Sequence, residues 1–378
     1  MHPKIEHIFT VSHPMQYIIA LEYCSKFSLD KNTCAVLIFN KPFGIQIQQL
    51  KATVNPIDWG HLEFIPYPNY WIEPGKKRTF KGKLKVSYSK IFSAWSFNKR
   101  LKAFLAEQCA SPLKVIGTGN YLSRPHRHFM ATAQKFNGVN EYVLLDEGTS
   151  IPHVVVPLRH NPDAKLTGKK TTRFSKNDWV GKTLELLTPL RSNTPEKVTF
   201  FTIFEDITPP QQDTVVINDF GRIKQHLDEF RTTNELWFIG TCFVEHNITT
   251  AEKYLKLIKT VKNTFPDQNI VYLPHRYESQ ENLKNIAALG ITILRPEMAI
   301  EPWMITHKKK PKHMAALASS AVSNINRIFG GAVPFTLFRP DESFFDTPER
   351  FKLWHKLIED TAKEGPSSIK ILEFYNQD

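Results

Sequence analysis

Short runs of β-branched and aromatic residues alternate with longer stretches of helical periodicity along most of this chain. Between residues 250 and 265, for example, Leu255, Ile258, Val261 and Phe265 recur every three or four residues, which is the spacing of one buried helical face. Strands that alternate with helices form βαβ units, in which the strands run parallel. The pattern therefore predicts an α/β fold built on parallel sheets.

The predicted strands fall into an early and a late group. The early strands are expected at 8–11, 35–39, 62–65, 113–117 and 142–145, and the late strands at 198–204, 215–217, 236–239, 269–273, 291–294 and 315–319. Helices are expected at 15–27, 97–108, 125–136, 250–265, 281–289 and 348–362.

The 378 residues are enough for two domains of ordinary size. A polar, proline-containing segment at 189–196 is the predicted boundary, and 209–213 is a second candidate. We expect one Rossmann-like domain over 1–195, another over 196–350, and a helix and tail over 351–378 that could return to the first domain. Two such doubly wound domains facing a central cleft would bind ligands at the carboxyl ends of their strands.

The net charge and the cysteine content indicate what kind of partner and which cellular compartment to expect. A formal net charge of +12 favours anionic partners. Four scattered cysteines without a CxxC pair predict a reduced, cytoplasmic protein rather than a zinc or disulfide scaffold. The sequence shows no signal-peptide pattern and no apolar run of about 20 residues, so any membrane contact is expected to be peripheral.

Two strand ends in the early group carry candidate ligand-binding residues. Ser12 and Gln16 follow the first strand at the start of a helix, where free backbone N–H groups attract anions, although a simple helix cap is the alternative. Gly119 and Asn120 follow the strand at 113–117, where glycine allows the backbone to approach a ligand closely.

The strand at 142–145 is followed by Asp146, Glu147 and Gly148. A carboxylate at a strand end can act as a general base toward a hydroxyl group. A turn that uses Asp146 with Gly148 is the structural alternative.

The strand at 269–273 is followed by Pro274, His275 and Arg276. A histidine beside an arginine can protonate a leaving phosphate while the arginine holds its charge. A structural histidine with a solvated arginine is the alternative.

Further candidates lie at neighbouring strand ends. Ser319 and Ser320 enter a predicted helix whose N-terminus could hold a phosphate. Glu301 could bind ribose hydroxyls, as the acidic residue of dinucleotide-binding folds does. Gly240 could let the strand at 236–239 approach a ligand.

Several common catalytic patterns are missing from the sequence. It contains no GxxxxGK[ST] phosphate loop, no GxSxG nucleophile elbow and no Asp-x-Asp in a setting that suggests a metal-held nucleotide diphosphate. His126 and His128 are two residues apart on a predicted helix, so they do not share a face as metal ligands would. We therefore expect no cofactor and no metal.

Taken in order, three motifs resemble those of bacterial sialyltransferases, in the form seen in the polysialyltransferase-like branch. Asp146-Glu147-Gly148 resembles the Asp/Glu-Asp/Glu-Gly motif, Pro274-His275-Arg276 resembles the His-Pro region, and Ser319-Ser320 resembles the serine motif. The opening Ser12-His13-Pro14-Met15-Gln16 is similar to that of the same branch. The resemblance runs from about residue 8 to about residue 322.

The resemblance implies an inverting, metal-independent transferase of the GT-B type that uses a CMP-activated sugar acid. It implies that Asp146 is the general base, that His275 is the general acid or phosphate stabiliser, that Ser319 and Ser320 hold the donor phosphate, and that Glu301 reaches the cytidine ribose. The proline precedes His275 instead of following it, and the Asp-Glu pair leaves open which carboxylate is the base. Donors other than sialic acid, such as CMP-Kdo, CMP-pseudaminic acid or another nucleotide sugar, remain an alternative.

Two basic clusters complete the sequence-based expectations. Lys76–Lys90 and Lys308–Lys312 are candidates for binding an anionic acceptor, such as lipooligosaccharide or capsule, or the inner face of the cytoplasmic membrane. Solvated loops are the structural alternative. A nucleic-acid-binding protein without catalysis is the rival function, because basic residues interleaved with aromatics also suit that role.

Overall fold

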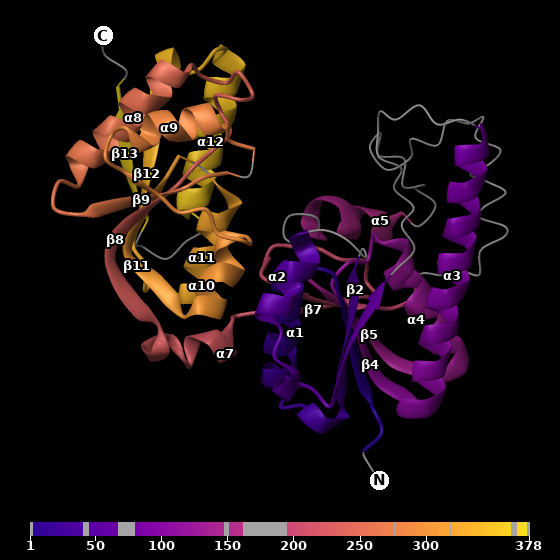
Figure 1. The fold of residues 1–378 in the computed structure, drawn as a ribbon. Helices are drawn as coiled ribbons and strands as arrows, with labels where there is room; N and C mark the ends of the chain where they lie inside the picture. Colours follow the sequence, from indigo (N-terminus) through magenta and orange to yellow (C-terminus); the bar gives the residue numbers. More distant parts are fainter. Residues whose placement is uncertain are drawn as a thin grey trace. The chain divides into compact units, whose positions relative to one another are not determined.

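The structure is a computed structural model, and it describes residues 3–40, 45–66, 80–146, 151–161, 195–275, 277–317, 319–363 and 369–375. The chain divides into two compact units, Met1–Asn218 and Asp219–Asp378 (Figure 1). We call them unit 1 and unit 2 and describe each by itself.

Unit 1 contains a sheet of seven described strands in the order β3-β2-β1-β4-β5-β6-β7, and every neighbouring pair is parallel. The strands are β1 (His7–Val11), β2 (Cys34–Asn40), β3 (His61–Pro66), β4 (Leu113–Thr118), β5 (Val139–Leu145), β6 (Thr199–Thr202) and β7 (Thr214–Ile217). The central strand β1 is buried along its whole length, as a strand covered on both faces must be.

The helices of unit 1 are α1 (Pro14–Lys26), α2 (Ile45–Thr53), α3 (Phe80–Gln108), α4 (Arg124–Phe136) and α5 (Val156–His160). The core draws on both sheet and helices, with Ile8, Leu37, Phe97, Phe129 and Phe200 among its buried members. This packing of apolar side chains supplies the main stabilising term of the unit.

Unit 2 contains a six-stranded parallel sheet in the order β10-β9-β8-β11-β12-β13. Its strands are β8 (Arg231–Ile239), β9 (Asn269–Leu273), β10 (Thr292–Ile293), β11 (Lys309–Ala316), β12 (Phe335–Pro340) and β13 (Ile369–Phe374). Its helices are α7 (Gly221–Lys224), α8 (Ala251–Thr264), α9 (Gln280–Ala287), α10 (Ile300–His307), α11 (Ser320–Phe329) and α12 (Pro348–Lys363).

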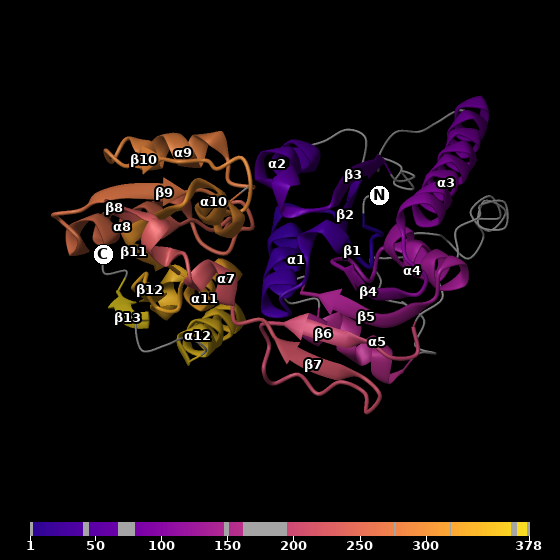
Figure 2. The same cartoon turned by 90° about the horizontal axis from the view of Figure 1, so that it is seen from below.

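The two sheets share one strand order. Numbered along each unit, the first six strands of unit 1 and the six strands of unit 2 both follow 3-2-1-4-5-6 (Figure 2). This is the Rossmann order, and ligands bind such sheets where the order reverses, at the carboxyl ends of the first and fourth strands. The expected binding edges are therefore those of β1 and β4 in unit 1, and of β8 and β11 in unit 2.

The structure confirms the α/β class and the two doubly wound, Rossmann-like units. All the predicted strands are present, and the helix expected at 97–108 is longer, since α3 begins at Phe80. The central cleft between the units stays a prediction. Strands β12 and β13 were not predicted.

The expected boundary between residues 195 and 196 is placed too early. Strands β6 and β7 extend the sheet of unit 1 by pairing with β5 and with each other. In addition, the buried guanidinium of Arg159 on α5 binds Asp213 through Nε and Nη2, at 2.5 and 2.7 Å, and the carbonyl oxygens of Pro195 and Glu196. These contacts tie residues 195–217 to unit 1.

The segment 351–378 also differs from expectation. Helix α12 contacts β12, β13 and α11, and β13 pairs with β12, so the segment belongs to unit 2 and not to the first domain. In the described ranges, none of the helices combines the length and the apolar character that a bilayer crossing demands.

Candidate functional site

At the binding edge of unit 1, the first helix is tied to the loop after β4. Gln16 is fully buried on α1, its Oε1 accepts a 2.7 Å hydrogen bond from the Ser12 backbone, and its Nε2 donates to the carbonyl oxygen of Gly119 at 2.5 Å. A Cβ atom at Gly119 would lie 2.6 Å from the Gln16 side chain, so this close approach requires glycine. Three residues proposed from sequence thus lie together at the reversal point.

A buried histidine joins the same edge. His126 on α4 is fully buried, its Nε2 lies 2.7 Å from the Ser12 hydroxyl, and its Nδ1 lies 2.9 Å from Thr10 and 3.1 Å from Thr118. Burial first, and then nearby His13, lower the pKa of His126 to about 3, so the ring is neutral near pH 7. His126 therefore orients Ser12 as a neutral hydrogen-bond partner, a role that its sequence position did not reveal.

Asp146 follows β5 and is only 2% exposed. Its Oδ2 accepts hydrogen bonds of 3.0 Å from the Thr202 hydroxyl and from the Ile203 backbone, both at the end of β6. The neighbouring strand therefore fixes the orientation of the carboxylate, while its burial limits access to an acceptor. Glu147 and Gly148 lie outside the described residues.

In unit 2, the loop after β9 carries half-buried Pro274 and His275. The His275 backbone N–H donates a 2.7 Å hydrogen bond to Oε1 of Glu278, and the Glu278 N–H donates back to the His275 carbonyl at 3.0 Å. These reciprocal bonds close a tight turn at His275. Arg276 lies outside the described residues.

Glu278 is the end of a buried chain of hydroxyl groups. Tyr272 donates to Glu278 Oε2 at 2.7 Å, Tyr254 lies 2.9 Å from Tyr272, and the Thr241 backbone donates to Tyr254 at 3.2 Å. Burial raises the pKa of Glu278 to about 7, although its hydrogen bonds from His275 and Tyr272 oppose the shift. Sequence reasoning missed this carboxylate, which stands only three residues after His275.

Gly240 packs directly against Glu278 and Tyr272, two members of this row of hydrogen-bonded groups. A Cβ atom there would lie 2.5 Å from Oε1 of Glu278 and 2.5 Å from the Tyr272 hydroxyl. Both neighbours are buried and hydrogen-bonded, so neither can move aside easily. Close packing therefore requires glycine at position 240. This requirement is separate from its proposed role near a ligand.

The other donor-side candidates meet at the start of α11. Ser319 caps this helix by accepting a hydrogen bond from the Ala321 backbone at 3.2 Å, and Ser320 begins it. Glu301 lies in the first turn of α10, and its Oε1 accepts a 2.9 Å hydrogen bond from Nδ2 of Asn324. Because Asn324 stands one helical turn after Ser320, this bond links Glu301 to the serine helix.

The remaining candidates are placed as follows. Asn120 follows β4, and its carbonyl oxygen accepts a hydrogen bond from Ser123 at 3.2 Å. Lys308 pairs with Glu229, and Lys309 lies 5.8 Å from the ring centroid of Trp303. Both lysines stand at the amino end of β11, so this basic cluster lies at the sheet edge opposite to Ser319.

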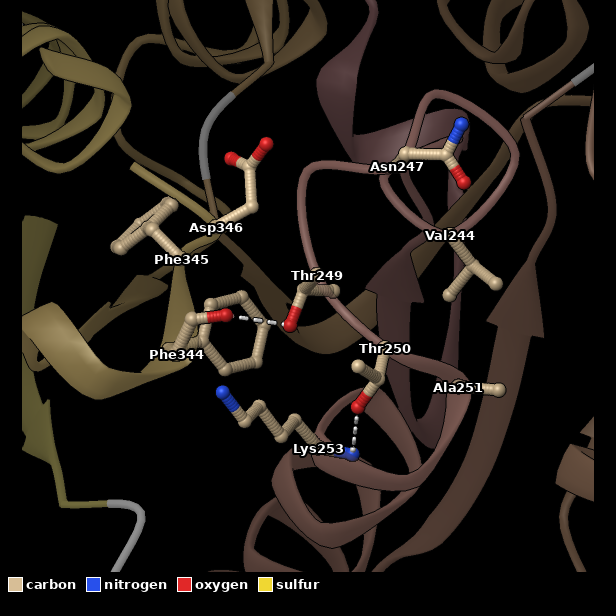
Figure 3. A pocket seen from close by; sticks show the side chains of 9 residues that line it. All are labelled: Val244, Asn247, Thr249, Thr250, Ala251, Lys253, Phe344, Phe345 and Asp346. Carbon is tan, nitrogen blue, oxygen red and sulfur yellow. Dashed lines mark hydrogen bonds between the residues drawn. The ribbon is translucent and has the colours of Figure 1, made fainter. Parts of the chain in front are cut away.

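A pocket of about 280 Å³ lies at the N-terminus of α8 in unit 2 (Figure 3). It is lined by residues of the loop after β8, of the first turn of α8 and of the segment after β12: Val244, Asn247, Thr249, Thr250, Ala251, Lys253, Phe344, Phe345 and Asp346. Thr249 donates to the Phe344 carbonyl at 2.5 Å across it. None of the residues proposed for the site lines this pocket.

Comparison with solved structures gives several matches of low identity. An α/β-galactoside α-2,3-sialyltransferase from the luminous marine bacterium Photobacterium phosphoreum is 12% identical, with 98% of each chain covered and a TM-score of 0.47. Acinetobacter baumannii MurG is 12% identical over 98% of this chain and 86% of that one, with a TM-score of 0.38, and Arabidopsis thaliana UGT89C1 is 10% identical over 99% and 86%, with a TM-score of 0.44. With TM-scores below 0.5, these likenesses carry no argument about function.

No curated protein matches the chain. A family model described as alpha-2,8-polysialyltransferase (POLYST), however, matches residues 7–335 and thus spans the predicted motifs in both units. This family is one of glycosyltransferases, which decides against the rival of a non-catalytic nucleic-acid-binding protein. The chain belongs to the alpha-2,8-polysialyltransferase family.

Proposed function

We propose that the protein transfers a sialic acid or a related nonulosonic acid from a CMP-sugar donor to a surface-glycan acceptor, with inversion and without a metal. The observation that carries the proposal is the grouping in unit 2 of Glu301, Asn324 and the Ser319 cap, on an edge that also carries the His275 turn. Parallel strands present their carboxyl ends on one edge, where a nucleotide binds in folds of this order.

On the donor side, Ser319 and Ser320 would hold the phosphate at the start of α11, where backbone N–H groups favour an anion. Glu301, oriented by Asn324, would accept hydrogen bonds from the ribose hydroxyls. His275 would protonate or stabilise the phosphate oxygen as the glycosidic bond breaks, because negative charge develops there in the transition state. Arg276 is proposed as an additional cation for this phosphate.

On the acceptor side, a carboxylate would take the proton of the attacking hydroxyl, and Asp146 is our first candidate. Its two hydrogen bonds to β6 hold it in one orientation, as a general base requires. Glu147 is the alternative base, because Asp146 is buried. A base and a leaving-group site on opposite sides of the donor sugar would give inversion.

A nucleotide screen by thermal unfolding tests the donor proposal. A ligand that binds only the native state raises the midpoint of unfolding, by a stabilisation of about 2.7 kcal/mol at 100 times its Kd. We expect CMP to raise the midpoint, and UDP, GDP and ADP to leave it unchanged, with EDTA having no effect on the CMP response. Stabilisation by UDP but not by CMP would overturn the proposed donor.

The sugar is tested by transfer assays with different CMP-sugars. CMP-Kdo and CMP-pseudaminic acid share the nucleotide with CMP-sialic acid, so they separate the choice of sugar from the choice of nucleotide. We expect CMP-sialic acid to be the preferred donor. Transfer only from another CMP-sugar would keep the nucleotide assignment and replace the sugar.

A further inference from the structure

Helix α3 carries an unusual stripe of lysines and aromatic residues. Phe92 is 68% exposed and Trp95 is 55% exposed, and Lys99 and Lys102 continue the same face at spacings of four and three residues. We define the lysine–aromatic stripe as the exposed residues Phe92, Trp95, Lys99 and Lys102.

The stripe lies opposite the face of α3 that packs on the core. Ala94, Phe97, Leu101, Phe104 and Leu105 are buried in the core of unit 1. Helix α3 has 29 residues, which corresponds to a length of about 44 Å. Figures 1 and 2 show its N-terminal half running past α4 and away from the sheet of unit 1. The stripe thus lies on the side of α3 that faces away from the core.

The charge around the stripe is strongly positive. Residues 74–106 contain ten of the 49 Lys and Arg residues and none of the 37 Asp and Glu residues. This segment therefore holds ten of the twelve formal net positive charges of the chain. Arg100 pairs with Glu63, but Lys99 and Lys102 are exposed, so a partner that covers the stripe is expected to be anionic.

The aromatic residues decide what kind of anionic partner fits. A soluble polyanion would neutralise the lysines, but it would leave the Phe92 ring in water, because that side chain has no polar atom to bind it. An anionic lipid surface can accommodate both kinds of side chain. The aromatic rings enter the boundary between headgroups and acyl chains, while the lysines remain at the phosphates. Lys102 also lies 5.4 Å from the ring centroid of Phe136, which is itself 46% exposed.

We propose that the lysine–aromatic stripe of α3 docks the protein on an anionic membrane surface, with α3 lying in the plane of the interface. This inference is independent of the proposed function, because it uses neither donor nor acceptor residues. A helix in this position would hold unit 1 beside lipid-linked acceptors without crossing the membrane.

Vesicle co-sedimentation of the full chain tests the proposal. We expect binding to vesicles of phosphatidylcholine with about 30% phosphatidylglycerol, weak binding to phosphatidylcholine alone, and release at high salt. The double variant Phe92→Ser/Trp95→Ser keeps all charges and should bind at least about tenfold more weakly. Lys99→Gln/Lys102→Gln keeps the aromatics and should bind about 25-fold more weakly, at about fivefold per lysine.

Helix α12 offers matched controls. Leu353 and Leu357 are 62% and 42% exposed, and Lys352 and Lys356 are exposed beside them. Leu353→Ser/Leu357→Ser and Lys352→Gln/Lys356→Gln should bind vesicles like the wild type. Far-UV circular dichroism and the unfolding midpoint check that each variant folds, and CMP binding by the α3 variants should be unchanged.

Two results would overturn the docking proposal. The first is unchanged vesicle binding by Phe92→Ser/Trp95→Ser. The second is a wild-type protein that ignores anionic vesicles but binds heparin through the stripe lysines, which would make the stripe a surface for a soluble polyanion. Failure of CMP to bind would affect the proposed function alone.

Discussion

The backbone N–H of His275 donates a 2.7 Å hydrogen bond to Oε1 of Glu278, a carboxylate that is only 4% exposed. The other carboxylate oxygen accepts a hydrogen bond of the same length from Tyr272 on β9. Glu278 therefore anchors the turn that carries His275 to the strand before it. This makes Glu278 a positioning residue for the proposed general acid.

Replacing Glu278 with alanine should impair His275 without removing it. The change leaves the His275 N–H and the Tyr272 hydroxyl without their acceptor, at a cost of about 1–3 kcal/mol for each buried group. We expect a lower unfolding midpoint and turnover reduced by about tenfold or more, with Glu278→Gln recovering most of the loss because its amide oxygen can accept one bond. An alanine variant with wild-type turnover would remove the positioning role.

The pKa of Glu278 predicts a pH dependence of stability. Burial raises this pKa from 4.5 to about 7, so the folded state binds the proton more tightly than the unfolded state does. This contribution is fully present below pH 4.5 and is lost as the pH rises toward 7, with a size of at most about 3 kcal/mol. Relative to wild type, Glu278→Gln should therefore become more stable as the pH rises from 5 to 8.

Urea unfolding of both proteins at several pH values measures this difference. Glu252→Gln, in the first turn of α8, is the matched control and should show no such trend. A difference between wild type and Glu278→Gln that stays constant from pH 5 to pH 8 would contradict the shifted pKa.

Gly240→Ala should destabilise unit 2. The added Cβ would lie 2.5 Å from both Glu278 and Tyr272, and overpacking of this kind costs about 1–3 kcal/mol. Gly221→Ala is the control, since its Cβ would meet Asp219 only at 3.6 Å. Chemical unfolding should show a loss for Gly240→Ala and little change for Gly221→Ala. Equal effects would mean that the close packing of Gly240 is not significant.

Asn324 should affect CMP binding by orienting the carboxylate of Glu301. Asn324→Ala removes the 2.9 Å hydrogen bond that orients the Glu301 carboxylate. We expect CMP affinity to fall by about twofold to tenfold, the range for one hydrogen bond, while the affinity for 2′,3′-dideoxy-CMP stays the same. Calorimetry with both nucleotides measures the preference. If both affinities fell equally, Asn324 would support the fold and not ribose recognition.

Variants of the two adjacent carboxylates should identify the general base. Asp146→Asn can still accept the bonds from Thr202 and Ile203, so it tests the charge with little loss of structure. If Asp146 is the base, turnover should fall by about 10²–10⁴-fold while CMP binding persists. Glu147→Gln is the paired measurement, and a loss found there instead would assign the role to Glu147.

Much of the candidate site could be predicted because strand ends are local features of the sequence. The apolar run before Ser12 in unit 1 and the run before Pro274 in unit 2 mark where strands stop, and within each sheet the parallel strands place such stops on one edge. The residues missed were those whose importance depends on hydrogen bonds that form only in the folded chain. Glu278, His126 and Asn324 became visible only when the fold placed them within hydrogen-bond distance of His275, Ser12 and Glu301.

The sequence by itself determined the α/β class, the positions of most strands and the family motifs, because each depends on periodicity or on a few adjacent residues. Only the tertiary structure decided which sheet a strand joins. Strands β6 and β7 follow a proline-containing, polar segment that looks like a domain boundary, yet they pair with unit 1. Their assignment is set by the hydrogen bonds of β6 to β5 and of β7 to β6, and by the buried ion pair between Arg159 and Asp213. Such contacts between distant residues leave no local pattern in the chain.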